Sequence, residues 1–182
     1  MNDPDDDPFE LLGLPPAFEL DAGSLRRTVR RRIAAHHPDR VADPLLREEA
    51  VRHVARLNEA LALLQDDERR ANLILRRLGG PAASEDRSLP PAFLMEILEI
   101  REDMEQAIAS GDPEERARVE AWATAERERL KQEVGGLLAR LADGEDCGGE
   151  VRLQLNVWRY IERMIEQLDP EGLDPFAGPG DG

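Results

Sequence analysis

Apolar residues recur through most of this chain at the three- and four-residue spacing of an amphipathic helix. The clearest stripe has spacings of four, three, four and three residues and consists of Ala50, Val54, Leu57, Leu61 and Leu64. Leucine, alanine, arginine and glutamate dominate the sequence, and aromatic residues make up only 4% of it. This composition favours helices over strands, which prefer β-branched and aromatic residues. The pattern predicts an all-α protein.

Proline, glycine and helix-capping residues divide the pattern into separate helices. In the first part of the chain we expect a short helix at 8–12, a second from about Asp21 to Ala35, a third that begins after Asp43-Pro44, and a fourth at 68–78. Farther along we expect three helices, at about 92–109, 113–142 and 150–168. The connections between these last three are short, which favours antiparallel neighbours and hence a three-helix bundle.

These boundaries predict two folded regions. The first covers residues 8–78, and the second, the three-helix bundle, covers residues 92–168, with a linker at 79–91 between them. Residues 1–7 form an acidic N-terminal extension, and we expect the Pro- and Gly-rich stretch 169–182 to be a disordered tail.

Composition restricts the kinds of protein that this chain can be. A hydrophobic fraction of 41% over 182 residues supports a packed core, whereas no apolar run approaches the ~20 residues that a membrane span needs. The single cysteine, Cys147, excludes an internal disulfide and a multi-cysteine zinc site. No secretory signal is visible near the N-terminus. We therefore expect a cytoplasmic protein that does not associate with a membrane.

The net charge of −15 is unevenly distributed. Residues 24–40 contain six arginines and one acid, a net charge of +5, whereas residues 92–182 contain twenty-two acids and ten bases, a net charge of −12. Phosphate repulsion over the acidic remainder makes the chain a poor candidate for binding nucleic acid. The basic strip suits either docking to an acidic protein surface or a solvated helix face.

The basic strip lies on the second predicted helix. At about 100° per residue, Leu25, Val29 and Ile33 form an apolar stripe, and Arg32 lies near its edge. Four arginines occupy the opposite face: Arg26, Arg27, Arg30 and Arg31. The helix ends at His37-Pro38-Asp39, because the residue before a proline is displaced from the α region. A polar turn therefore follows directly on a basic helix face.

Enzymatic chemistry finds little support in the sequence. Four residues are candidate metal ligands: His36, His37, Asp39 and His53. Adjacent histidines in a turn point apart, and His53 lies on the apolar stripe of the third helix, which favours a packing role. No serine or cysteine has the context of a nucleophile, and no glycine-rich phosphate loop is present. We expect a protein that is not an enzyme and that uses no metal or cofactor.

The first helix of the predicted bundle has apolar residues on two faces. A narrow arc suits the core and consists of Phe93, Ile97, Ile100, Met104 and Ile108. Leu94, Met95 and Leu98 fall outside that arc, and acidic residues lie among them: Glu99, Glu102 and Glu105. Apolar residues among acids indicate either a surface for a partner or a helix that packs against two neighbours. The pattern alone leaves both alternatives open.

His37-Pro38-Asp39 lies between the basic helix and a third helix that contains Leu57-Asn58-Glu59-Ala60, and this arrangement resembles the J domain of the DnaJ superfamily. Two further stretches, 9–15 (FELLGLP) and 92–102 (AFLMEILEIRE), resemble the HscB-type co-chaperones of iron–sulfur cluster assembly. With the C-terminal helices included, the resemblance covers about residues 8–168.

The resemblance implies a J domain that docks on an ATP-bound DnaK-family chaperone of the HscA type and triggers ATP hydrolysis there. On this interpretation His37, Pro38 and Asp39 are the trigger, and the four arginines guide docking. The bundle would bind an iron–sulfur scaffold protein of the IscU type through six residues: Leu94, Met95, Leu98, Glu99, Glu102 and Tyr160. A further acidic position of the family is Gln106 in this chain.

Two other functions remain compatible with the sequence. The bundle of a J-domain protein can serve an unrelated client, and a purely structural helical protein can contain His-Pro-Asp by chance. The feature that distinguishes a scaffold-binding bundle from the first alternative is the patch of Leu94, Met95 and Leu98 with its acids. A chaperone ATPase assay distinguishes the second.

Overall fold

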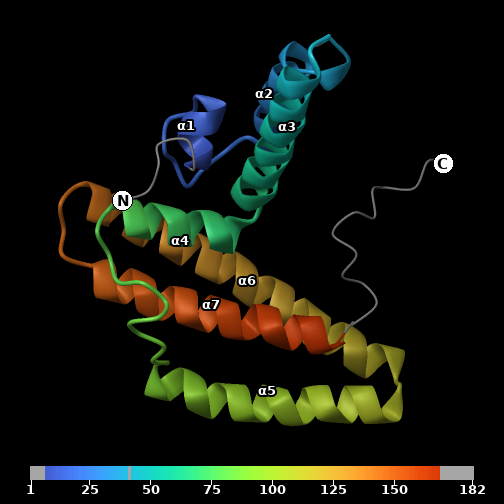
Figure 1. Cartoon of the computed structure of the whole chain (residues 1–182). Helices are drawn as coiled ribbons and strands as arrows, with labels where there is room; N and C mark the ends of the chain where they lie inside the picture. The colour runs from blue at the N-terminus through green and yellow to red at the C-terminus, as the bar shows by residue number, and fades with distance from the viewer. Residues whose placement is uncertain (1–6, 41, 169–182) are drawn as a thin grey trace. The chain divides into compact units, whose positions relative to one another are not determined.

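The computed structural model describes residues 7–40 and 42–168, and these residues are largely helical, with no strand among them (Figure 1). The chain divides into two compact units, residues 1–78 and 79–182. The predicted all-α class is therefore confirmed. The predicted tail at 169–182 and most of the predicted N-terminal extension lie outside the described residues. None of the described helices combines the length and the apolar character that crossing a membrane requires.

The first unit contains, in its described residues, α1 (Pro8–Leu12), α2 (Ala22–Ala35), the 3₁₀ turn η2 (Pro38–Arg40), α3 (Pro44–Gln65) and α4 (Asp67–Arg77). α2 and α3 are antiparallel and pack side by side, and η2 lies at the end of the pair (Figure 1). Aspartates cap these helices where the sequence predicted caps. The Asp21 carboxylate accepts from the Ser24 N–H at 2.6 Å, and the Asp43 carboxylate accepts from the Leu45 N–H at 2.9 Å.

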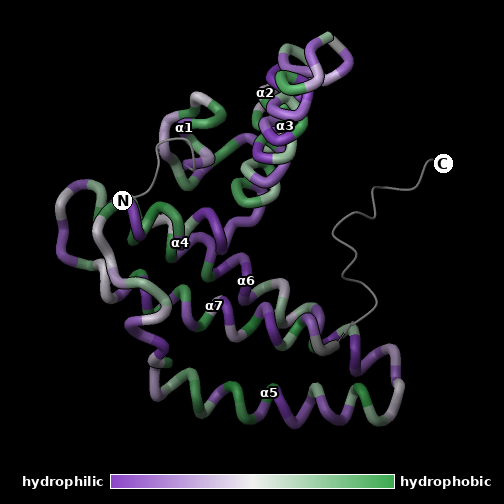
Figure 2. Tube along the Cα trace, viewed as in Figure 1, coloured by the Kyte–Doolittle hydropathy of each residue, from purple (hydrophilic) through white to green (hydrophobic). Residues whose placement is uncertain are grey.

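The core of the first unit lies where α1, α2 and α3 meet. Its buried side chains include Phe9, Leu12, Val29, Leu57 and Leu64. The hydropathy colouring of Figure 2 shows how apolar and polar segments alternate along these helices. Burying one side chain of this kind contributes about 1.5–3 kcal/mol. This cluster therefore holds α2 and α3 together and positions the turn at the end of the pair.

Asp7 is part of the first unit and not of an N-terminal extension. Its carboxylate accepts from the Phe9 N–H at 2.9 Å and so caps α1. The same carboxylate pairs with Arg77 at the end of α4, and Arg77 also lies 3.8 Å from Glu10. The sequence prediction placed Asp7 outside the domain because a run of acids does not indicate which of them is the cap.

A charged side chain, Arg70, lies in the interior of the first unit and is only 4% exposed. Its Nε donates to the Phe18 carbonyl at 2.7 Å, and its other nitrogens donate to the Leu64 carbonyl and the Asp67 carboxylate. The guanidinium also lies over the Phe18 ring, 5.2 Å from the centroid. A buried guanidinium loses solvation, and here three acceptors and a ring compensate for that loss. Arg70 thus joins α4 to the loop between α1 and α2.

The second unit is a bundle of α5 (Pro91–Ser110), α6 (Pro113–Ala142) and α7 (Gly148–Leu168). Neighbouring helices run antiparallel, as their short connections predicted (Figure 1). α6 and α7 share the most extensive contact, and α5 packs against both. Arg127 joins α6 to α7 through two bonds of 2.7 Å to the Glu162 carboxylate, which also accepts from the Trp158 indole N–H at 2.9 Å. The central side chains are buried: Leu130, Val134, Val151, Leu155, Trp158 and Ile161.

The segment that precedes α5 is attached to α7. The Asn156 amide donates to the carbonyls of Asp86 and Ser88 at 3.2 and 3.0 Å, and Gly80 lies against Gly148. Within the segment, hydrogen bonds from the side chain and the N–H of Ser88 lower the pKa of the Asp86 carboxyl. The stretch that the sequence predicted as a linker is therefore packed on the second unit.

One predicted core position in α5 is wrong. Ile108 is 54% exposed, and Ala107 is buried instead. The two residues lie at opposite edges of the buried arc, about 100° apart around the helix. Near the end of α5 the buried side of the helix is therefore the side of the small Ala107 side chain. Phe93, Ile97 and Met104 are buried as predicted.

Candidate functional sites on the two units

The His37-Pro38-Asp39 turn follows the end of α2, and its polar side chains are exposed. The His37 side chain is 48% exposed and that of Asp39 is 86% exposed. Pro38 begins η2, and its ring holds φ at about −65°. The Asp39 N–H donates to Nδ1 of His37 at 3.3 Å, and an Asp39 carboxylate oxygen lies 3.6 Å from the same nitrogen. The turn thus presents an imidazole and a carboxylate together, which can donate and accept hydrogen bonds with a partner.

The two other histidines pack against each other beside this turn. The ring centroids of His36 and His53 are 4.7 Å apart, with 56° between the ring planes. Nδ1 of His36 lies 3.1 Å from the Arg32 carbonyl oxygen, and His53 is half-buried. Among the described residues, no group of three or more His, Cys, Asp or Glu side chains is arranged to hold a metal ion. These histidines therefore join the end of α2 to α3.

The arginine face of α2 is exposed along the helix: Arg26, Arg27, Arg30 and Arg31 are all exposed. Two of them have local contacts, since Arg26 donates to the Ala22 carbonyl at 3.3 Å and Arg27 lies 3.5 Å from Asp21. No ion pair within residues 7–40 and 42–168 involves Arg30 or Arg31. Like charges spaced by three or four residues repel one another and add little to stability. Their positive potential is available to an acidic partner.

Arg32, the fifth arginine of α2, has a different environment. It is half-buried, and its guanidinium lies 2.5 Å from the position that a Cβ at residue 13 would occupy. Gly13 also has a φ of +61° at the end of α1, which favours glycine. The glycine of the FELLGLP stretch therefore makes room for Arg32, whose half-buried side chain agrees with its place near the edge of the apolar stripe.

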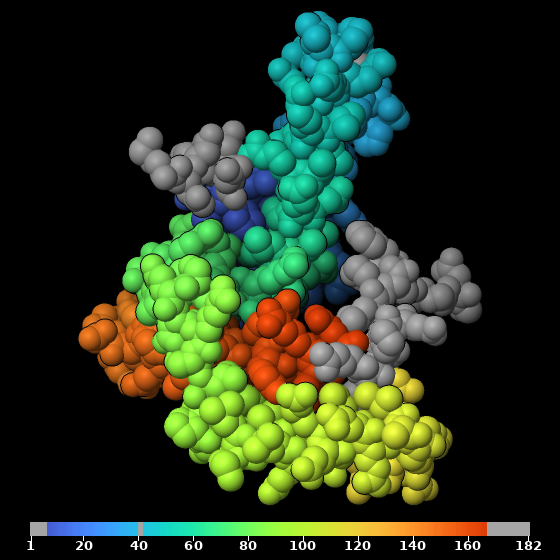
Figure 3. All heavy atoms as spheres, turned by 60° about the horizontal axis from the view of Figure 1, so that its bottom comes forward, coloured from blue at the N-terminus to red at the C-terminus, as the bar shows by residue number. Residues whose placement is uncertain are grey.

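The outer face of α5 carries an exposed apolar patch of Leu94, Met95 and Leu98, here called the α5 patch. Their exposed fractions are 46%, 70% and 57%, so α5 does not bury them against a second neighbour. Glu99 and Glu102 are exposed beside them. Figure 3 shows the outer side of α5, in green to yellow, open to view. The packing alternative is excluded, and the patch is an apolar surface with an acidic border.

Two further predicted residues have partners within the bundle. Tyr160 of α7 is half-buried, and its ring meets that of Phe93 edge to face, with the centroids 5.7 Å apart. Tyr160 thus supports α5 at Phe93, the residue that precedes Leu94 in the chain. Gln106 is exposed, and its amide donates to the Glu115 carboxylate of α6 at 2.7 Å. A carboxylate is therefore present beside the position where the resemblance implies an acid.

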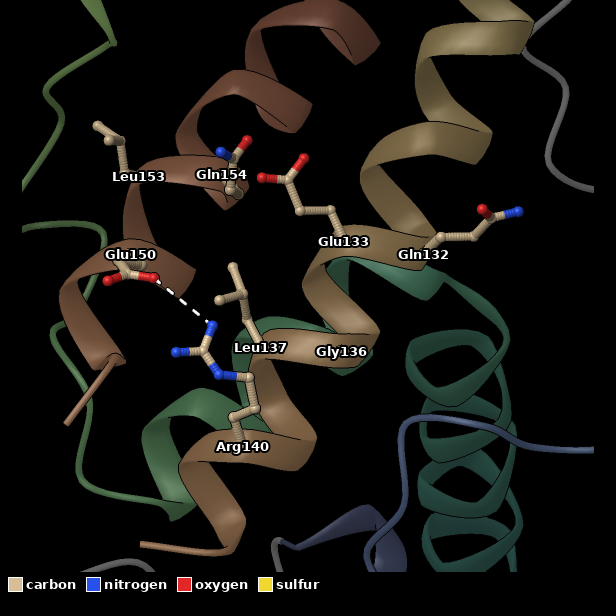
Figure 4. A pocket seen from close by; sticks show the side chains of 8 residues that line it. All are labelled: Gln132, Glu133, Gly136, Leu137, Arg140, Glu150, Leu153 and Gln154. Carbon is tan, nitrogen blue, oxygen red and sulfur yellow. Dashed lines mark ion pairs between the residues drawn. The ribbon is translucent and has the colours of Figure 1, made fainter. Parts of the chain in front are cut away.

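A groove of about 450 Å³ lies between α6 and α7 (Figure 4). Its walls include Gln132, Gly136 and Arg140 of α6 and Glu150 of α7. Arg140 lies 2.8 Å from Glu145 and 3.9 Å from Glu150, and the hydrogen bond that Arg140 donates to the Glu145 carboxylate raises the pKa of its guanidinium. The charge of this arginine is thus satisfied inside the chain. None of the site residues predicted from the sequence lines the groove.

An exposed apolar pair at the start of α3 was missed by sequence reasoning. Leu45 is 74% exposed and Leu46 is 54% exposed. The predicted stripe of α3 began only at Ala50, so these two residues fell outside it. The signal that could have indicated them is their position: they directly follow the cap Asp43-Pro44 and precede the stripe that begins at Ala50.

The comparisons with known proteins cover both units. Residues 89–169 match the family model described as the HSCB C-terminal oligomerisation domain. The co-chaperone protein HscB homolog of Ralstonia nicotianae is 37% identical over 176 residues, which cover 93% of this chain and 99% of that relative.

Two solved structures are similar to this one. Chaperone HscB from Vibrio cholerae has a TM-score of 0.63 at 31% identity, over 89% of this chain and 99% of that chain. The human co-chaperone protein HscB has a TM-score of 0.79 at 20% identity, over 94% of this chain and 85% of that chain, which shows a shared fold. Since similarity in sequence and in fold extends over nearly the whole chain, this protein belongs to the HscB family of co-chaperones.

Proposed function

We propose that this protein binds an iron–sulfur cluster scaffold protein of the IscU type, delivers it to a DnaK-family chaperone of the HscA type, and stimulates the ATPase activity of that chaperone. The observation that carries the proposal is the exposure of two different surfaces on two units. One is a polar turn beside a basic helix face, and the other is an apolar patch with an acidic border. Two such surfaces suit two different partners.

On the first unit, the arginine face attracts an acidic surface of the chaperone over about a Debye length, ~8 Å at physiological salt. After docking, His37 donates a hydrogen bond to the chaperone and Asp39 accepts one. Pro38 restricts the turn, so little conformational entropy is lost on binding. ATP is hydrolysed in the active site of the chaperone, and this chain contributes contacts and no catalytic group.

On the second unit, the α5 patch supplies apolar anchors for the scaffold protein. Glu99 and Glu102 border the patch, so they favour a partner with basic side chains around an apolar surface. Tyr160 supports the patch through its contact with Phe93. We place this activity in the cytoplasm, because a chain with a single cysteine suits a reducing compartment.

The test is steady-state ATP hydrolysis by a purified HscA-type chaperone. We expect the full chain to raise turnover, and scaffold protein added to the chain to raise it further. Turnover that does not respond to the chain would refute the J-domain part of the proposal. If the chain stimulates the chaperone but does not bind the scaffold protein in isothermal titration, the J-domain part of the proposal stands and the scaffold is not the client. The chain would then be an adaptor for another protein.

A further inference from the structure

The apolar stripe of α3 that faces α2 continues past the end of α2. Its buried members include Leu57 and Leu64, and at about 100° per residue Leu46 points in nearly the same direction. His36, which follows the last residue of α2, meets His53. Leu46 precedes His53 by seven positions, so α3 extends about 10 Å beyond that contact. This explains why Leu46 is 54% exposed although it continues a core stripe.

The exposed stretch lies close to the His37-Pro38-Asp39 turn. η2 packs against α3, and only five residues separate Asp39 from Leu45. A chain segment of that length spans at most about 20 Å. Leu45, at 74% exposed, widens the apolar surface that Leu46 begins. An apolar pair thus lies within about 20 Å of the polar turn, at the same end of α3.

We propose that Leu45 and Leu46 form an apolar contact for the ATPase chaperone, next to the turn and the arginine face. The inference rests on the function proposed above and adds a third component to the same docking surface. Charges on an exposed face mainly increase the association rate and are screened by salt. Apolar side chains that become buried in an interface slow dissociation and respond little to salt. The arginines would therefore speed the formation of the complex, and the apolar pair would prolong its lifetime.

A second copy of this chain is a poorer occupant of the pair. A twofold contact centred on Leu45 and Leu46 would bring the same surface of both copies together. The basic strip at 24–40, with its net charge of +5, ends five positions before Leu45 and would then approach its own copy. Repulsion between the two strips opposes such a dimer. An acidic partner attracts the strip, so the charge favours the chaperone.

The test measures binding kinetics of the full chain to the ATP-bound chaperone at low and high KCl. We expect L45S/L46S to raise koff roughly tenfold, which corresponds to about 1.4 kcal/mol, with kon and its salt dependence unchanged. V51S is the matched control, because Val51 is 53% exposed on the same helix. It lies about 140° around the helix from Leu46, so its koff should equal that of the wild type.

The outcomes separate the inference from the proposed function. Wild-type koff in L45S/L46S, with normal ATPase stimulation by the wild type, would overturn the inference alone. A wild-type chain that does not bind the chaperone would overturn both. A changed sedimentation coefficient of the free double variant would assign the pair to self-association and also overturn the inference. If the double variant melts early, the single variants Leu45→Ala and Leu46→Ala repeat the test, each with a smaller expected rise in koff.

Discussion

The backbone N–H of Asp39 donates to Nδ1 of His37 at 3.3 Å. A ring nitrogen that accepts a hydrogen bond carries no proton, so neutral His37 has its proton on Nε2. The half-exposed ring then offers a donor to a partner, whereas the exposed Asp39 carboxylate beside it offers acceptors. The two ends of the turn therefore have opposite hydrogen-bonding character.

His37→Gln and Asp39→Asn are each expected to abolish stimulation of the chaperone ATPase. Glutamine has no ring N–H donor at the position of His37 Nε2, and asparagine lacks the negative charge of Asp39. Both side chains are exposed, so the free energy of unfolding should change by no more than about 0.5 kcal/mol. ATPase turnover and urea denaturation of the same variants check both expectations. Wild-type stimulation by either variant would contradict the J-domain mechanism.

Reversing Arg27 and Arg30 to glutamate is expected to slow association with the chaperone and to flatten the salt dependence of binding. The reversal removes repulsion along α2 and also the exposed Arg27–Asp21 pair, so the melting temperature should change little. Stopped-flow association at several KCl concentrations measures the effect. Arg76→Glu is the control, since Arg76 is exposed on α4, a helix of the same unit that packs on α3 and not on α2. An association rate that changes neither with the reversal nor with the salt concentration would rule out electrostatic docking.

The triple variant L94A/M95A/L98A is expected to lose scaffold binding while it melts nearly as the wild type does. Its residues are 46–70% exposed, so truncation empties few packed contacts. Apolar anchors at an interface can each contribute about 2 kcal/mol or more to binding. Ile97→Ala on the same helix is the control, because Ile97 is 2% exposed and its truncation should cost about 2–5 kcal/mol of stability.

The triple variant should still stimulate the chaperone when no scaffold protein is present, because the His37-Pro38-Asp39 turn lies on the other unit. Scaffold titration, thermal melting and the ATPase assay on one preparation separate these effects. Undiminished affinity for the scaffold would remove the α5 patch from the client interface.

Arg70→Ala is expected to destabilise the first unit by about 3 kcal/mol, because it leaves buried acceptors without a donor. Arg70→Lys should be less harmful but still destabilising, since an ammonium group cannot reach all three acceptors in the geometry of the guanidinium. Denaturation of the two variants in urea compares them. Equal stability of Arg70→Lys and the wild type would show that only the charge matters at this position.

Local signals predicted most of the fold. Asp21 and Asp43 precede helical patterns in the sequence and cap α2 and α3 in the structure. The outward side of α5 could be predicted because the helical repeat of about 100° per residue alone places Leu94 and Leu98 outside the core arc. Such signals depend on residues within a turn or two of one another.

The features that were missed depend on contacts between distant residues. Nothing near Asn156 indicates that its amide bonds to the carbonyls of Asp86 and Ser88, 68 or more positions away. Ile108 fits the core arc, and its exposure depends on which side of the end of α5 the rest of the bundle covers. Leu46 continues a buried stripe, and its exposure follows from where α2 ends.

The hydrogen bond from Arg70 to the Phe18 carbonyl joins residues 52 positions apart. It can form only after a loop of that length closes, which is costly before neighbouring helices have paired. A contact formed late in folding affects the unfolding rate more than the folding rate. We therefore expect variants of Arg70 to fold about as fast as the wild type and to unfold faster. The lifetime of the folded J domain thus depends on a side chain buried away from both proposed binding surfaces.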